Sequence, residues 1–205
     1  MRKVVILMSL VVAAVAQAAT PSEGVPLKVR RGFFTETDIG VFFTLGGQSG
    51  YSNAQTYLQL GVGYDVTENI EFGAHFGIGA NSQNCFAVTE PGDCVVRSGP
   101  KDVTAFPDNF TFTFLDATAA YLFKLADRFY ISPRLVVGYT LLDPAPLQDA
   151  NGDPVNSGLN VGGALGVEYA TYMDHFTIGA DASARIVLGP NIVAIAIFPR
   201  VKYTF

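Results

Sequence analysis

The chain ends on Ile197-Phe198-Pro199-Arg200-Val201-Lys202-Tyr203-Thr204-Phe205, and this stretch decides the fold. In a strand, Val201, Tyr203 and Phe205 share one face, because successive side chains point to opposite sides. A terminal aromatic residue preceded by apolar residues at every second position is typical of outer-membrane β-barrels, whose aromatic rings lie at the membrane interface. We therefore predict that Val201, Tyr203 and Phe205 form a C-terminal insertion signal for the barrel-assembly machinery.

The opposite end of the chain carries the pattern of an export signal. Arg2 and Lys3 precede an apolar run over residues 4–16, and Ala16-Gln17-Ala18 is a small-residue cleavage site. The run is shorter than the ~20 apolar residues that a membrane-spanning helix needs. It therefore predicts a cleaved signal peptide over residues 1–18.

Composition indicates a single domain that is inserted in a membrane. The mean hydropathy is +0.30, yet no further apolar run is long enough to span as a helix. A membrane barrel produces this combination, because its apolar residues are dispersed at every second position. We expect residues 19–31 to form a periplasmic tail and residues 32–205 to form the barrel. The net charge of −5 argues against a nucleic-acid partner.

Alternation with a period of two recurs along the mature chain and predicts eight strands. The expected strands cover about residues 33–45, 54–64, 70–79, 115–123, 129–140, 159–169, 176–188 and 193–205. Apolar side chains occupy one face of each strand, while glycine, small and charged side chains occupy the other. The predicted fold is all-β: an eight-stranded antiparallel transmembrane barrel of the outer membrane with up-and-down topology.

The fourth strand has an irregular phase. Leu115 and Ala117 belong to its apolar face, but Phe110, Phe112 and Phe114 alternate in the opposite phase. Two interpretations are open: a bulge near Phe114 shifts the register, or the strand continues above the bilayer and these rings pack against a loop.

Connection lengths predict the orientation of the barrel. Short connections (65–69, 126–128, 173–175) alternate with longer ones (46–53, 80–108, 143–158), although the last outer connection, 189–191, is short. Because periplasmic turns are short and extracellular loops are long, both termini are expected in the periplasm. A soluble barrel would put the apolar face inside and the charges outside. The faces that carry Arg or Glu are rich in glycine, which favours a narrow interior and hence the membrane barrel.

The predicted inward face carries charges of both signs. They are Glu36, Asp38, Glu71, Asp116, Glu168 and Asp181, with Lys124, Arg134, Arg185, Arg200 and Lys202. Barrel closure sets the first strand beside the last, which brings Glu36 and Asp38 level with Arg200 and Lys202. Unpaired charges in a narrow lumen cost several kcal/mol, so these side chains must pair. We favour an ion-pair plug over a gated or proton-conducting pore, because side chains just fill an eight-stranded interior.

The sequence predicts a disulfide but neither an enzyme nor a cofactor. His75 is expected in the lumen and His175 in a turn, which is not a catalytic arrangement, and no metal-ligand spacing is present. Cys85 and Cys94 lie in the longest loop of an exported chain and are expected to form a disulfide.

Residues 31–47 (RGFFTETDIGVFFTLGG) and 51–65 (YSNAQTYLQLGVGYD) resemble the adventurous-gliding motility protein CglE family of myxobacteria. The resemblance implies an outer-membrane component of a trans-envelope gliding complex, working with other barrels, lipoproteins and periplasmic proteins at sites of surface adhesion. It supplies no catalytic residues. Two functions follow as hypotheses: a structural and adhesive platform in outer-membrane lipid, or a small-solute or ion channel.

Overall fold

The computed structural model describes residues 32–45, 55–81, 110–148, 153–173 and 175–205. The predicted signal peptide, the periplasmic tail and the Cys85–Cys94 pair lie outside these residues.

Eleven strands make up the described chain. They are β1 (Gly32–Leu45), β2 (Gln55–Asp65), β3 (Ile70–Asn81), β4 (Phe110–Tyr121), β5 (Phe123–Ala126), β6 (Phe129–Asp143), β7 (Leu147–Gln148), β8 (Pro154–Val155), β9 (Ser157–Ala170), β10 (Phe176–Val187) and β11 (Ile192–Thr204). β5 continues the line of β4 after a break at Leu122, and β7 pairs only with β8. The wall therefore has eight strands, as predicted.

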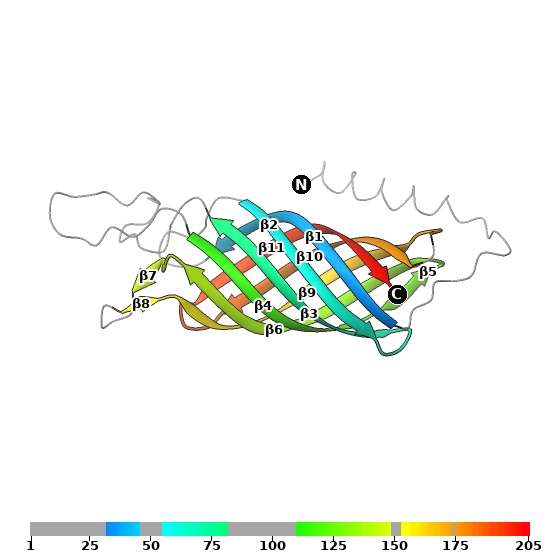
Figure 1. The fold of residues 1–205 in the computed structure, drawn as a ribbon, viewed down its shortest axis with the longest axis horizontal. Helices are drawn as coiled ribbons and strands as arrows, with labels where there is room; N and C mark the ends of the chain where they lie inside the picture. The colour runs from blue at the N-terminus through cyan, green and yellow to red at the C-terminus, as the bar shows by residue number, and fades with distance from the viewer. Residues whose placement is uncertain (1–31, 46–54, 82–109, 149–152, 174) are drawn as a thin grey trace, which may run out of the picture.

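The eight strands close into an antiparallel barrel. The sheet runs β4-β3-β2-β1-β11-β10-β9-β6, and β6 pairs back with β4. Each strand pairs with its neighbours along the chain, and the first strand pairs with the last. This confirms the up-and-down topology, and Figure 1 shows the strands tilted around the barrel axis. No helix in the described ranges is long and apolar enough to span a membrane.

The two ends of the barrel differ. The turns β2–β3, β5–β6 and β9–β10 lie at one end, here called the turn end, together with Phe205 (Figure 1). Phe205 N donates to Phe33 O at 2.8 Å, so both ends of the described chain meet there. The opposite end, here called the loop end, carries the β7–β8 hairpin and the β10–β11 connection.

The outer face of the barrel is an apolar belt. Large apolar side chains such as Ile39, Leu135 and Leu159 are 57%, 58% and 61% exposed. A soluble barrel would bury these side chains, whereas a membrane barrel turns them toward lipid. This inversion favours the membrane barrel over the soluble one.

Aromatic side chains gather on the belt near the turn end. Tyr203 contacts Phe176 and Phe205, with ring centroids 4.9 and 5.0 Å apart. Phe33 and Tyr64 form a similar pair at 5.0 Å. The residues proposed as an insertion signal thus lie on the outer face: Val201 and Phe205 are exposed and Tyr203 is half-buried. Rings at this level are typical of a membrane-interface girdle.

Both interpretations of the irregular phase in the fourth strand are wrong. β4 pairs without interruption with β3, from Phe110↔Asn81 to Tyr121↔Ile70, and it pairs continuously with β6. Phe112 and its neighbours at every second position point into the barrel. No bulge occurs near Phe114, and the rings belong to the lumen.

The predicted inward position of Lys124 is also wrong, because its side chain does not face the lumen. It lies on β5 at the turn end, where the pairing with β6 shifts register between Lys124 and Ala126. Its side chain is 47% exposed, and its ammonium group lies 2.9 Å from the Asp127 carboxylate.

Inward-facing glycines make room for large lumen side chains. A Cβ added at Gly61 would lie 2.6 Å from Glu36 Cγ and 2.7 Å from His75 Nε2. A Cβ at Gly79 would lie 2.8–2.9 Å from ring carbons of Phe42. These distances are shorter than real Cβ contacts, so the interior needs glycine at these positions.

Gly61→Ala is therefore expected to destabilise the barrel by about 1–3 kcal/mol, the usual cost of overpacking a filled interior. Gly163→Ala is the matched control, because Gly163 is exposed on the outer face and a Cβ added there would lie 3.3 Å from its nearest neighbour, Arg134 O. The check is the urea midpoint of the heat-modifiable folded band on gels. Equal midpoints for the two variants would contradict the tight interior.

Candidate functional site: the barrel lumen

The lumen is filled in three layers. At the turn end, Leu122, Tyr130 and Ala170 form a small apolar cap. Charged side chains fill the middle, here called the ion-pair layer, and aromatic side chains fill the half toward the loop end. Within the ion-pair layer, Lys202 also makes a cation–π contact, with its Nζ 3.8 Å from the centroid of the buried Phe34 ring.

Carboxylates outnumber cations in the ion-pair layer. The buried carboxylates are Glu36, Asp38, Asp65, Glu71, Asp116, Glu168 and Asp181, and the buried cations are Arg134, Arg185, Arg200 and Lys202. His75 is buried among them. The sequence predicts Asp65 in a turn, but it ends β2 with its side chain buried on the inward face.

Register brings the expected residues together at the seam between β1 and β11. Glu36 lies opposite Lys202, and Asp38 lies opposite Arg200. The contacts, however, run diagonally rather than straight across. Lys202 Nζ lies 2.9 Å from Asp65 Oδ1 and 2.6 Å from Glu71 Oε2. A lysine side chain is long enough to reach past the residue opposite it to carboxylates on β2 and β3.

Arg200 is the most connected cation of the seam. Its guanidinium nitrogens lie 2.7 Å from Glu168 Oε1, 3.2 Å from Asp181 Oδ2 and 3.5 Å from Glu36 Oε2. Its side chain is 1% exposed. Arg200 thus joins three carboxylates from three strands.

Glu36 connects Arg200 to the other side of the lumen. Arg134 donates to Glu36 Oε1 at 3.1 Å and to Glu71 Oε1 at 3.0 Å. His75 Nε2 also contacts Glu36 Oε1. Through these contacts the network spans from Lys202 to Arg200 without leaving the ion-pair layer.

A second hydrogen-bonded chain borders the aromatic half. Arg185 pairs with Asp116 and donates to Tyr57 OH at 3.1 Å. Tyr57 OH donates to Gln59 Oε1 at 2.6 Å, and Gln59 Nε2 donates to Asp38 Oδ2 at 2.8 Å. The Arg185 guanidinium also lies 4.4 Å from the Phe114 ring centroid. This residue therefore joins the ion-pair layer to the aromatic half by a cation–π contact.

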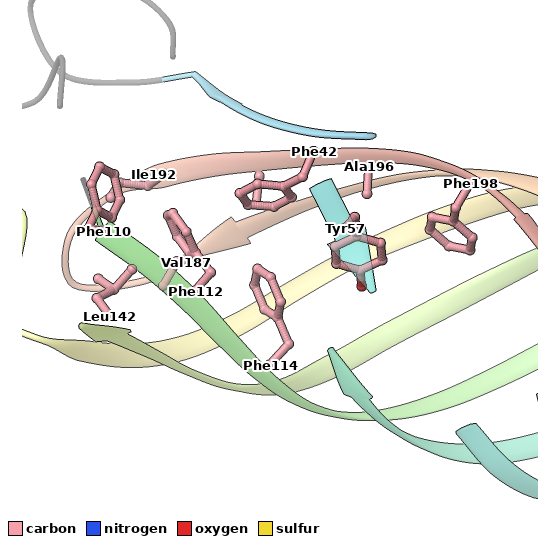
Figure 2. Close-up of a cluster of buried hydrophobic side chains, with 11 residues drawn as sticks. Phe42, Tyr57, Phe110, Phe112, Phe114, Leu142, Val187, Ile192, Ala196 and Phe198 are labelled. Atoms are coloured by element: carbon pink, nitrogen blue, oxygen red, sulfur yellow. The ribbon is translucent and has the colours of Figure 1, made fainter. Parts of the chain in front are cut away.

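The aromatic half is an apolar plug made of side chains from several strands. The aromatic plug consists of Phe42, Tyr57, Phe110, Phe112, Phe114, Leu142, Val187, Ile192, Ala194, Ala196 and Phe198, most of which Figure 2 labels. Phe112 stacks on Phe114 with centroids 5.6 Å apart and contacts Phe42 at 5.2 Å. Sequence reasoning missed this plug, although Phe110, Phe112 and Phe114 share the phase of the inward Asp116.

A small cavity lies where the ion-pair layer meets the aromatic half. It lies among polar and apolar side chains, and its volume of about 10 Å³ is about the room that one water molecule needs. Gln59, Asp116, Arg134, Ser183, Arg185 and Phe198 line it. Such a cavity can hold a bridging water but cannot bind a solute.

The described residues hold no cluster of three metal-ligating side chains. The two histidines are far apart: His75 is in the lumen, and His175 Nδ1 lies 2.5 Å from Thr204 O at the turn end. In the β5–β6 turn, the hydrogen bond from Lys124 holds the pKa of Asp127 below its usual value. Both side chains of this ion pair are exposed to solvent, so the pair lies outside the lumen network.

The fold of this chain is similar to solved structures of outer-membrane proteins. Neisserial surface protein A is 15% identical, with 85% of this chain and 97% of that chain covered and a TM-score of 0.56. Ail, the attachment invasion locus protein of Yersinia pestis, is 11% identical, with 85% and 99% covered and a TM-score of 0.49. No protein-family model matches the chain, and no curated protein does.

At these identities the likeness to Neisserial surface protein A concerns the fold. Together with the apolar belt and the buried ion-pair layer, it defines the class of this protein: an eight-stranded β-barrel of the outer-membrane type.

Proposed function

We propose that this protein is a non-enzymatic barrel of the bacterial outer membrane that serves as a structural and adhesion component of a gliding-motility complex. The observation that carries the proposal is the filled lumen, closed by the aromatic plug above the ion-pair layer. A barrel without a solute pathway acts through its surfaces: the lipid-facing belt, the external loops and the periplasmic turns. The gliding role rests on the resemblance of residues 31–47 and 51–65 to the CglE family.

The proposed orientation puts the turn end in the periplasm and the loop end outside. Export by the signal peptide 1–18 and insertion by the barrel-assembly machinery would leave the tail 19–31 facing periplasmic partners. The Cys85–Cys94 loop would then face the surface on which the cell moves. A disulfide there would lower the entropy lost when the loop engages a surface or another protein.

A catalytic role is disfavoured by the lumen geometry. His75 contacts Glu36 inside the ion-pair layer, where a substrate has no room to enter. The alternative function, a small-solute or ion channel, would draw on the same charged residues. Phe112, Phe114 and the rest of the aromatic plug count against it, because they fill the path toward the loop end.

Surface labelling tests the orientation in a Cys85→Ser/Cys94→Ser background. A cysteine at Asn156, at the loop end, should react with a membrane-impermeant thiol reagent on intact cells. A cysteine at Asp127, at the turn end, should react only after the outer membrane is opened. The reverse pattern would contradict the proposed topology.

Single-cell gliding tests the function. The Cys85→Ser/Cys94→Ser variant should fold and reach the outer membrane, since strand pairing and lipid-facing burial stabilise the barrel. It should lower gliding speed, because the loop loses its constraint. Lys124→Ala, a change at an exposed turn-end residue, is the control and should glide at wild-type speed. Wild-type speed for the double variant as well would argue against the loop as the adhesive element.

A further inference from the structure

Asp38 is the lumen carboxylate that has no cation beside it. Each of the other six has an Arg or Lys nitrogen within 4.0 Å. Across the described residues, no such nitrogen lies within that distance of Asp38. The side chain is fully buried, at 0% exposure. An ionised carboxylate in this position would be uncompensated, which is strongly unfavourable in a sealed interior.

The hydrogen bonds of Asp38 are also incomplete for an ionised carboxylate. Oδ2 accepts one bond, from the neutral amide of Gln59, and Oδ1 has no partner among the described residues. In this arrangement the amide oxygen of Gln59 accepts from Tyr57 OH, so the amide nitrogen is the atom that faces Asp38. A carboxylate usually accepts several bonds, so this environment suits a neutral carboxyl group better.

The charged groups that face Asp38 do not supply the missing cation. Glu36 on β1 and Asp181 on β10 add negative charge, and Arg134 on β6 is paired with Glu36 and Glu71. On β11, Arg200 lies opposite in register but extends to Glu36, Glu168 and Asp181. On β2, the neighbour is the uncharged Gln59. With seven carboxylates and four Arg or Lys side chains, the layer lacks positive charge even when His75 is protonated.

We propose that Asp38 is a proton-binding site of the folded barrel, with its carboxyl group protonated at neutral pH and the hydrogen on Oδ1. Unfolding exposes the group to water, where it releases this proton and becomes a carboxylate. The proton neutralises Asp38 in place of a cation, so the closed lumen contains no uncompensated charge at this position.

The location of Asp38 gives this proton a structural consequence. Asp38↔Arg200 is the last paired position before an interruption of the β1–β11 ladder at Ile39 and Gly40. There β11 contributes Pro199, which has no N–H to donate. An ionised Asp38 would place an unpaired negative charge next to this interrupted part of the closing seam. A neutral Asp38 leaves the seam without a charge that would draw water into it.

Asp38→Asn tests the proposal, with Asp116→Asn as the matched control for a lumen acid that pairs with an arginine. If Asp38 is neutral in the folded barrel, Asp38→Asn should raise the urea midpoint at neutral pH, because the variant folds without the cost of binding a proton at this site. Asp116→Asn should lower the midpoint, because it removes the partner of Arg185. On refolding at neutral pH in weak buffer, the wild type should take up about one more proton per chain than Asp38→Asn. Equal proton uptake, or a midpoint lowered as much as in Asp116→Asn, would overturn the proposal.

A second measurement uses the wild type alone. Infrared spectra of the folded barrel in lipid, with aspartate labelled by ¹³C at the carboxyl carbon, should contain the carbonyl band of a protonated carboxyl group. The absence of that band at neutral pH would overturn the proposal. A salt effect would also overturn it: the wild-type urea midpoint would rise in sodium chloride but not in choline chloride, and Asp38→Asn would show no such rise. Asp38 would then be an ionised carboxylate that is balanced by a bound metal cation.

Discussion

Arg200→Ala should unfold at a much lower urea concentration than the wild type, with a loss of about 3–5 kcal/mol in the free energy of unfolding. The substitution removes the guanidinium that lies within 4.0 Å of Glu36, Glu168 and Asp181. These carboxylates would remain buried with less compensation, and a buried charge without its partner is costly.

Lys124→Ala is the control for this experiment, because it removes a positive charge that is exposed to solvent. Exposed ion pairs contribute little to stability, so its urea midpoint should stay close to that of the wild type. The chain contains no tryptophan, so the folded fraction is best followed by the heat-modifiable gel shift. Equal midpoints for the two variants would mean that the lumen ion pairs do not stabilise the fold.

Phe112→Ala should be the most damaging single truncation of the aromatic plug, at about 3–5 kcal/mol. Phe112 is 0% exposed and contacts the rings of Phe42, Phe110 and Phe114 at centroid distances of 5.2–5.6 Å. Truncation leaves an apolar void inside a closed wall, where the neighbouring strands cannot collapse into the space.

Phe72→Ala separates this packing effect from the simple loss of an aromatic ring. Phe72 is 52% exposed on the outer face, where lipid can fill the space that its ring leaves. Its urea midpoint should therefore fall much less than that of Phe112→Ala. A larger fall for Phe72→Ala would show that the plug is loosely packed.

The wall of the barrel can be predicted from sequence because each membrane strand alternates between lipid and lumen. Ile39 and Leu135 face outward and Glu36 faces inward for this reason, and closure sets Asp38 opposite Arg200. Alternation with a period of two thus predicts both the faces and the register.

The phase of the alternation is ambiguous where both faces of a strand are apolar. In β4, Phe112 and Leu115 are equally hydrophobic, and Asp116 alone identifies the inward face. The sequence pattern presents the phenylalanines as an irregularity of the apolar face, and for that reason it does not predict the aromatic plug in the lumen. The predicted inward position of Lys124 is wrong for a related reason: the alternation continues past the point where β5 leaves the enclosed lumen.

The pairing of lumen side chains could not be predicted from register. Lys202 lies opposite Glu36 but binds Asp65 and Glu71, because a long side chain extends toward the best-placed carboxylate in three dimensions. That choice depends on the packing of all eight strands and on the space that glycines such as Gly61 leave free.

Conductance across a planar lipid bilayer is the measurement that tests the sealed lumen most directly. Purified, folded wild-type barrel, with insertion verified by protease protection in matched vesicles, should give no steady current above that of the bare bilayer. The aromatic plug and the ion-pair layer fill the path between the two ends. Steady, reproducible channel currents from the wild-type protein would contradict the sealed lumen and favour the channel function instead.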